Sequence, residues 1–100
     1  MPRIRTVKPE FWSDFKTGTL SSTATKLFIG MLNYADDFGV IEYNIDEIKA
    51  KVFPYNNIGK DILTKAFEDE ILPKGLAIVV LIDLKQYLFI KNFVSHQVID

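Results

Sequence analysis

The sequence predicts a small α+β domain. Three segments carry apolar residues at helical spacing, and three shorter runs rich in β-branched and aromatic residues show no helical period. The chain has 100 residues, of which 48% are hydrophobic and 25% charged, and it contains no long polar tract. A chain of this length and composition can bury one core, so we expect a single domain over residues 1–100.

The first helix is predicted to follow the serine pair Ser21-Ser22 and to end before Gly39. A serine side chain can cap the first turn of a helix, and glycine commonly stands just after the last turn. One face of this helix would be apolar and buried. It comprises Leu27, Phe28, Met31, Leu32 and Ala35.

A short strand and a second helix are expected next. Residues 39–43, with the sequence Gly-Val-Ile-Glu-Tyr, contain β-branched and aromatic residues and favour a strand. Asn44, with Glu47 three residues later, is typical of a capped helix start, and Pro54 would end the helix. The predicted buried face of this helix is Ile45, Ile48 and Val52.

A third helix and a hairpin complete the prediction. Asn56-Asn57 would cap the helix, and residues 73–75, which include a proline and a glycine, would end the segment. Its apolar face would be Ile58, Ile62, Leu63, Ala66 and Phe67. Residues 76–82 and 87–90 are strand-like and separated by residues 83–86, which suits an antiparallel hairpin.

The order of elements is therefore helix, strand, helix, helix, strand, strand. This is the order of the winged-helix variant of the helix-turn-helix, with three helices and a small antiparallel β-sheet or wing. The short first strand would pair with the later hairpin, and the second and third helices would form the turn unit. A small α+β domain of another topology is the alternative.

Composition excludes most catalytic chemistry. The chain has no cysteine and one histidine, His96, so a disulfide framework, a thiol nucleophile and a multi-histidine metal site are excluded within one chain. The adjacent carboxylates Asp36 and Asp37 have no third ligand at suitable spacing and are interpreted as capping or surface groups. We expect no enzymatic activity, no metal and no cofactor.

The net charge of −1 conceals an uneven distribution. Basic residues outnumber acidic ones five to two in residues 1–26, whereas acidic residues outnumber basic ones five to one in residues 27–50. A basic arm, at about residues 1–15, therefore precedes an acidic block. No apolar run has secretory or membrane-spanning length, so we expect a cytoplasmic protein without membrane contact.

Four stretches resemble a known family. They are Arg-Ile-Arg-Thr-Val-Lys-Pro-Glu-Phe-Trp (3–12), Leu-Phe-Ile-Gly-Met-Leu-Asn-Tyr-Ala-Asp-Asp-Phe-Gly (27–39), Lys-Ala-Lys-Val-Phe-Pro-Tyr (49–55) and Phe-x-x-His-Gln (93–97). In this order they resemble the N-terminal domain of phage replisome organisers, the DnaD-like replication-initiation proteins of phages and prophages. The resemblance implies a winged-helix domain in a bacterial host cell that binds duplex DNA at an origin-type site. It also implies helicase recruitment through host replication proteins, by a part of the protein that would lie outside these 100 residues.

Candidate DNA-binding residues follow from the predicted fold. Winged-helix proteins offer the exposed side of the third helix to the major groove and the hairpin tip to the backbone or minor groove. The candidates on and before the third helix are Asn56, Asn57, Lys60, Thr64 and Lys65, and Lys85 is the candidate in the wing. The basic arm adds Arg3, Arg5 and Lys8, which could enter a minor groove. Alternatively, apolar neighbours dock the arm on the body and its arginines pair with Asp36 or Asp37.

Two functions are therefore predicted as alternatives. The first is a non-catalytic DNA-binding module of a phage replication-initiation protein. The second is a winged-helix protein-interaction module, either a homodimer or a binder of a host replication or regulatory protein, without direct DNA binding. The acidic block favours the second, and exposure of Trp12 or Tyr55 would support it.

Overall fold

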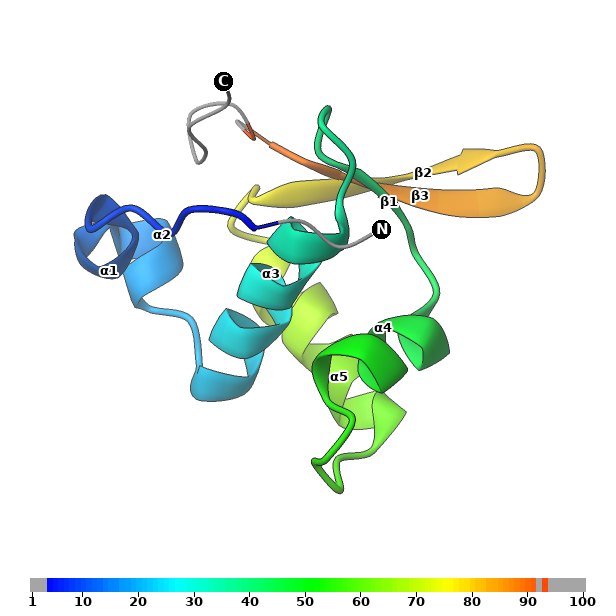
Figure 1. The fold of residues 1–100 in the computed structure, drawn as a ribbon, viewed down its shortest axis with the longest axis horizontal. Coiled ribbons are helices and arrows are strands. Elements are labelled where there is room, and N and C mark those ends of the chain that lie inside the picture. Colours follow the sequence, from blue (N-terminus) through cyan, green and yellow to red (C-terminus); the bar gives the residue numbers. More distant parts are fainter. Residues whose placement is uncertain (1–3, 92, 94–100) are drawn as a thin grey trace.

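The computed structural model describes residues 4–91 and residue 93. Helices form most of the first two thirds of the chain, with one short strand among them. The last third supplies the other two strands of a three-stranded antiparallel sheet (Figure 1). The α+β class predicted from the sequence is confirmed. The elements are α1 (Glu10–Ser13), α2 (Phe15–Gly18), α3 (Ser22–Tyr34), β1 (Val40–Glu42), α4 (Ile45–Val52), α5 (Lys60–Ala66), a π-helical turn η1 (Phe67–Ile71), β2 (Ala77–Ile82) and β3 (Lys85–Ile90).

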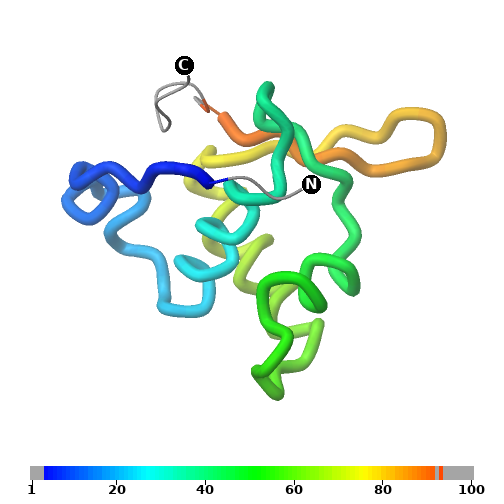
Figure 2. The backbone as a smooth tube through the Cα atoms, viewed as in Figure 1, coloured from blue at the N-terminus to red at the C-terminus, as the bar shows by residue number. Residues whose placement is uncertain are grey.

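Helix α3 is the centre of the fold. It contacts α4, α5 and η1 on one side, and the ring of Phe11 in α1 stacks on its residue Phe28. The sheet lies along one side of the helices, and the β2–β3 hairpin extends beyond them (Figures 1 and 2). No helix among the described residues has the length and apolar character needed to cross a bilayer.

The start of α3 is as predicted, but its end is earlier. Ser21 is the N-cap, and its hydroxyl oxygen accepts a hydrogen bond from the backbone N–H of Ala24 at 3.2 Å. The predicted apolar face is buried throughout. The helix ends at Tyr34 rather than near Gly39, because Ala35 is extended and Asp36 begins a turn. In that turn the Asp36 carboxylate accepts from the backbone N–H groups of residues 38 and 40.

Helix α4 confirms its predicted cap. The side-chain oxygen of Asn44 accepts from the backbone N–H groups of Asp46 and Glu47, at 3.1 and 3.2 Å. Ile48 is buried, and the other two residues of the predicted face pack against the core. The carboxylate of Glu47 accepts from Lys51 Nζ at 2.7 Å, in an i,i+4 pair on the exposed side.

Helix α5 departs from the prediction at its start. It begins at Lys60 with Gly59 as N-cap, and no side chain caps it, so the predicted Asn56-Asn57 cap is wrong. Asn56 has a different partner, described below. Leu63, Ala66 and Phe67 are buried as predicted, whereas Ile62 is 52% exposed, which corrects its expected burial.

The sheet has the strand order β1-β3-β2. Ile41 lies opposite Leu88, and Val80 lies opposite Tyr87, so the first strand pairs with the hairpin as expected. The hairpin connection is shorter than the four residues predicted, since only Asp83 and Leu84 lie between the strands, both with positive φ. Such a two-residue turn matches the twist of the flanking strands.

The N-terminal segment contains the two short helices that the sequence analysis missed. Pro9 precedes α1, and the carboxylate of Asp14 caps α2 by accepting from the backbone N–H of Lys16 at 2.8 Å. Phe11 is buried beside α3, so the segment packs on the body rather than extending away from it.

Candidate nucleic-acid interface

Polar side chains from two distant parts of the chain meet beside the connection between α4 and α5. On α3, Lys26 Nζ donates a hydrogen bond to Asn56 Oδ1 at 2.8 Å and lies 4.9 Å from the centre of the Phe53 ring. A shallow hollow of about 370 Å³ adjoins this contact. It is lined by Ser22, Thr23, Lys26, Phe53, Asn56, Asn57 and Ile58.

The polar surface continues onto α5. A second hollow shares Thr23 with the first and reaches Ile62 and Lys65 of α5. We call the surface formed by these polar residues the α3–α5 face. Its members are Ser22, Thr23, Lys26, Asn56, Asn57 and Lys65.

The amino-terminal end of α3 adjoins this face, because Ser21 lines the second hollow. A helix N-terminus carries partial positive charge and attracts anions. Here the carboxylate of Glu70 is the neighbouring anion: it accepts from the backbone N–H and from the hydroxyl of Ser21, both at 2.7 Å. This contact joins the end of η1 to the start of α3.

The candidates on α5 have different surroundings. Lys60 is exposed, and its Nζ lies 3.6 Å from Asp46 Oδ1. The hydroxyl of Thr64 donates to the carbonyl of Lys60 at 2.8 Å, so its donor is used within the helix. Lys65 is exposed on the side of α5 that faces the second hollow. Of the three, Lys65 is the one that joins the α3–α5 face.

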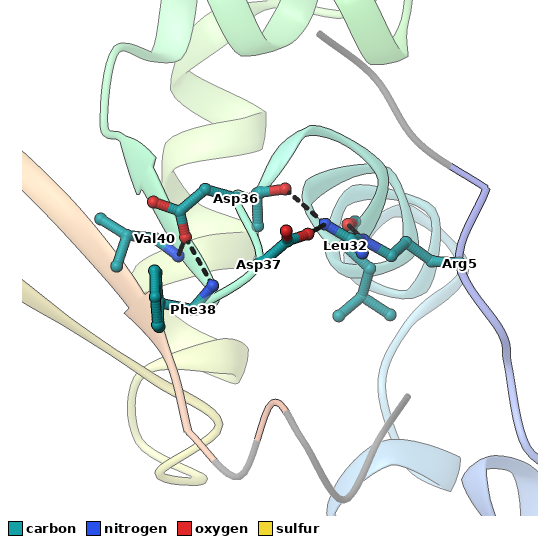
Figure 3. Close-up of polar contacts among 7 residues, drawn as sticks. Arg5, Leu32, Asp36, Asp37, Phe38 and Val40 are labelled. Carbon is teal, nitrogen blue, oxygen red and sulfur yellow. Dashed lines mark hydrogen bonds and ion pairs between the residues drawn. The ribbon is translucent and has the colours of Figure 1, made fainter. Parts of the chain in front are cut away.

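The arm is attached to the body through Arg5. Its Nε donates to the carbonyl of Leu32 at 3.1 Å and its Nη2 to the carbonyl of Ala35 at 2.9 Å (Figure 3). Nη2 also lies 3.5 Å from Asp37 Oδ1, and the side chain is only 8% exposed. The guanidinium is therefore held within the fold, and the pairing expected in the alternative interpretation of the arm is observed for Arg5. Lys8 is half-buried, and Arg3 lies outside the described residues.

Lys85 is separate from the other candidates. It is exposed at the first position of β3, beside the hairpin turn, whereas α5 lies on the other side of the molecule (Figure 1). Over residues 77–90 it is the single cation, and the hairpin is otherwise mainly apolar. The structure thus places Asn56 and Asn57 in one hollow and Lys65 in the hollow that adjoins it at Thr23, but it leaves Lys85 apart.

Sequence reasoning missed the contribution of α3 to this face. Ser22, Thr23 and Lys26 recur at i, i+1 and i+4 on the side of the helix away from its apolar stripe. That spacing could have identified a polar face. Its meeting with Asn56 could not have been read from the pattern, because 30 residues separate Lys26 from Asn56.

A second surface is apolar. A cleft of about 1,030 Å³ lies between the N-terminal segment, α3 and the end of α4. Trp12, 60% exposed, lines it together with Leu20, Ile29, Tyr34 and Val52. On the rim, Lys51 Nζ lies 5.1 Å from the centre of the Tyr34 ring. The exposure expected of Trp12 and Tyr55 in an interaction module is observed for both.

The described residues contain no group of three or more His, Cys, Asp or Glu side chains that could hold a metal ion. Comparison of the chain with protein-family models, with curated proteins and with solved structures finds no match. The function of this protein must therefore be inferred from its own residues.

Proposed function

We propose that this chain is a non-catalytic DNA-binding module of the winged-helix type that contacts duplex DNA through the α3–α5 face. The observation that carries the proposal is that Lys26, Asn56 and Asn57 line one hollow, which Thr23 connects to a second hollow at Lys65 of α5. The order α3, β1, α4, α5, β2, β3 supports it. In this order α5 is the third helix, and the third helix of a winged-helix protein is the one offered to the major groove.

Each part of the face has a chemical role in this proposal. Lys26 and Lys65 pair with phosphates, and the amides of Asn56 and Asn57 reach base edges or phosphate oxygens. Lys60 adds a further phosphate contact when its exposed pair with Asp46 opens. Lys85 touches the DNA backbone from the hairpin, and Arg3 and Lys8 of the arm remain candidates for the minor groove. Arg5 acts indirectly, because it anchors the arm to α3.

The acidic residues on α5 and η1 set the expected strength of binding. Asp61, Glu68 and Asp69 are exposed close to Lys65 and oppose the approach of a polyanion. We therefore expect binding that is clear at low salt and weakens steeply as salt increases, since phosphate contacts release counterions. From the resemblance of four stretches to phage replisome organisers, we propose that such a module acts in replication initiation at an origin-type site.

Fluorescence anisotropy tests the proposal. Labelled duplex and single-stranded oligonucleotides are titrated with the protein over a series of salt concentrations. Binding of the duplex with a negative dependence of log K on log salt is the expected result. Absence of binding at the lowest salt would reject the proposal.

A protein-interaction module is the second candidate, and the apolar cleft at Trp12 favours it. Clefts lined by aromatic and aliphatic side chains with an exposed tryptophan are typical of protein-binding sites. The test is a pull-down from bacterial lysate with the wild-type chain and with Trp12→Ser. Two results together would favour this function over the first. The wild-type chain, but not Trp12→Ser, would capture a host replication protein, and the wild-type chain would not bind DNA in the anisotropy titration.

A further inference from the structure

The outer edge of β2 is an unpaired strand edge. β2 lies at one side of the sheet, and no described strand pairs with its outer edge. The backbone N–H of Lys91 donates to the carbonyl of Leu76, so alternate residues from Leu76 onward turn their backbone groups toward β3. Ala77, Val79 and Leu81 therefore turn their N–H and C=O groups away from β3, where no described strand pairs with them. We call this row of groups the β2 edge.

The side chains of β2 are apolar on both faces of the sheet. Residues 77–82 include no charged or polar residue. Four of them are markedly exposed: Leu81 is 66% exposed, Ile82 46%, Ile78 43% and Val80 36%. Leu81 lies on the same face as Ala77, which is in the core, and Val79, which packs against it. The end of the hairpin extends beyond the helices (Figure 1). Exposed apolar edges of this kind are ready to pair with another strand.

The opposite edge of the sheet is protected. β1 is three residues long and contains the exposed Glu42. Its outward-facing residue Val40 has both backbone groups occupied by Asp36. The Val40 N–H donates to Asp36 Oδ1 at 3.0 Å (Figure 3), and the Asp36 N–H donates to the Val40 carbonyl at 2.9 Å. A charge and a local turn thus block β1, whereas among the described residues nothing comparable blocks β2.

We propose that the β2 edge is a dimer interface, at which two copies of this chain pair antiparallel to form one six-stranded sheet. A two-fold axis perpendicular to the sheet brings residues of the same face together. The register that uses the outward backbone groups and pairs the most apolar side chains places Val80 opposite Val80 of the second copy. Val79 then faces Leu81 of the second copy, and Ile78 faces Ile82 of the second copy.

A second copy is the occupant because β2 is complementary to itself. In this register apolar residues meet apolar residues on both faces, and no two like charges are opposed. Leu81, which is 66% exposed in its own chain, lies beside Val79 of the second copy at the margin of that copy's core. Pairing stops at two chains, because the blocked β1 edge cannot extend the sheet. An interface this small predicts weak association, with a Kd of about 1–100 μM.

Sedimentation velocity and a charge swap test the interface. The wild-type chain is expected to change from monomer to dimer between about 1 μM and about 1 mM. Val80→Lys and Val80→Glu should each be monomeric, because like charges meet on the axis, and an equimolar mixture of the two should dimerise again. Circular dichroism confirms that each variant is folded. A monomer at every concentration, growth beyond the dimer, or a dimer unaffected by Val80→Lys would overturn the proposal.

Single cysteines test the register. The natural chain has no cysteine, so any disulfide formed is assigned without ambiguity. Val80→Cys should cross-link the dimer on oxidation, since residues opposite each other in a non-hydrogen-bonded pair have Cα atoms about 4.5 Å apart. Ile82→Cys is the matched control. In this register the sulfur of one copy and the sulfur of the other are offset by four residues, about 13 Å along the strand, so they should not cross-link. Equal cross-linking of both variants would reject the register. DNA has no part in these tests, so their outcome is independent of the proposed function.

Discussion

Arg5 and Ala35 connect the N-terminal segment to the carboxyl end of α3. Arg5 Nη2 donates to the Ala35 carbonyl at 2.9 Å, and the same guanidinium reaches the carbonyl of Leu32 through Nε. The last carbonyls of a helix have no partner within it, and a cation there also complements the helix dipole. A residue that the sequence analysis assigned to the basic arm and to DNA contact therefore has partners within the fold.

Replacement of Arg5 should destabilise the fold. Arg5→Gln removes two charge-assisted hydrogen bonds from a side chain that is almost fully buried, so we expect the free energy of unfolding to fall by about 2 kcal/mol. Urea denaturation measures this change. Lys16→Gln, at an exposed position of α2, is the control and should change stability little. Equal effects of the two variants would contradict the anchoring role.

Gly30 allows α3 and α4 to approach closely. A Cβ at this position would lie 2.5 Å from Val52 Cγ1, and a valine side chain has little rotamer freedom with which to move away. Gly30→Ala should therefore cost about 2 kcal/mol despite the better helix propensity of alanine. Val52→Ala in the same chain should recover most of that loss. If the losses of unfolding free energy from Gly30→Ala and Val52→Ala were additive in a double-mutant cycle, the contact between the two residues would not be the cause of the destabilisation.

The hairpin turn contains a correctable strain. Leu84 has a φ of 67°, in the left-handed region that a leucine side chain disfavours, and it makes an exposed apolar tip. Leu84→Gly should raise the free energy of unfolding by about 1 kcal/mol. Thermal or urea unfolding measures the gain. The same substitution should leave the proposed dimer intact, because Leu84 lies outside β2.

Alkaline pH should destabilise the protein through Tyr43. Burial of its ring, with a smaller contribution from the Glu68 carboxylate, raises the pKa of Tyr43, and the ring stacks on Phe67 with centroids 4.8 Å apart. Because the folded-state pKa exceeds the unfolded value, the stabilisation is complete below about pH 10 and is lost as pH rises through the folded pKa. Denaturation across this range should show the decline, and Tyr43→Phe should reduce it. Tyr55→Phe, at an exposed position, should leave it unchanged.

Salt dependence should identify the lysines that contact DNA. Each phosphate contact contributes about one unit to the slope of log K against log salt. Lys26→Ala and Lys65→Ala should each reduce the slope by about one unit, whereas Lys16→Ala, at an exposed position of α2 that is not part of the α3–α5 face, should not. Anisotropy titrations provide the slopes. Identical slopes for all three variants would place the DNA elsewhere on the protein.

Local pattern was enough to predict the elements that are long or clearly capped. The buried stripe of α3, the cap of α4 by Asn44 and the pairing of the hairpin with β1 were all predicted correctly. Helices α1 and α2 were missed because four residues cannot show a helical period. The start of α5 was misplaced because the amide of Asn56 bonds to Lys26 instead of to the helix that follows.

The sequence by itself determined the α+β class, the order of the main elements and the exclusion of cysteine and multi-histidine chemistry. Only the tertiary structure decided which polar residues meet. Lys26 and Asn56 are 30 residues apart, Arg5 and Ala35 also 30, and Ser21 and Glu70 are 49 apart. Helical and strand periods specify which side of an element is apolar, but they contain no information on which distant polar group its other side will face. That choice depends on how the elements pack around the common core.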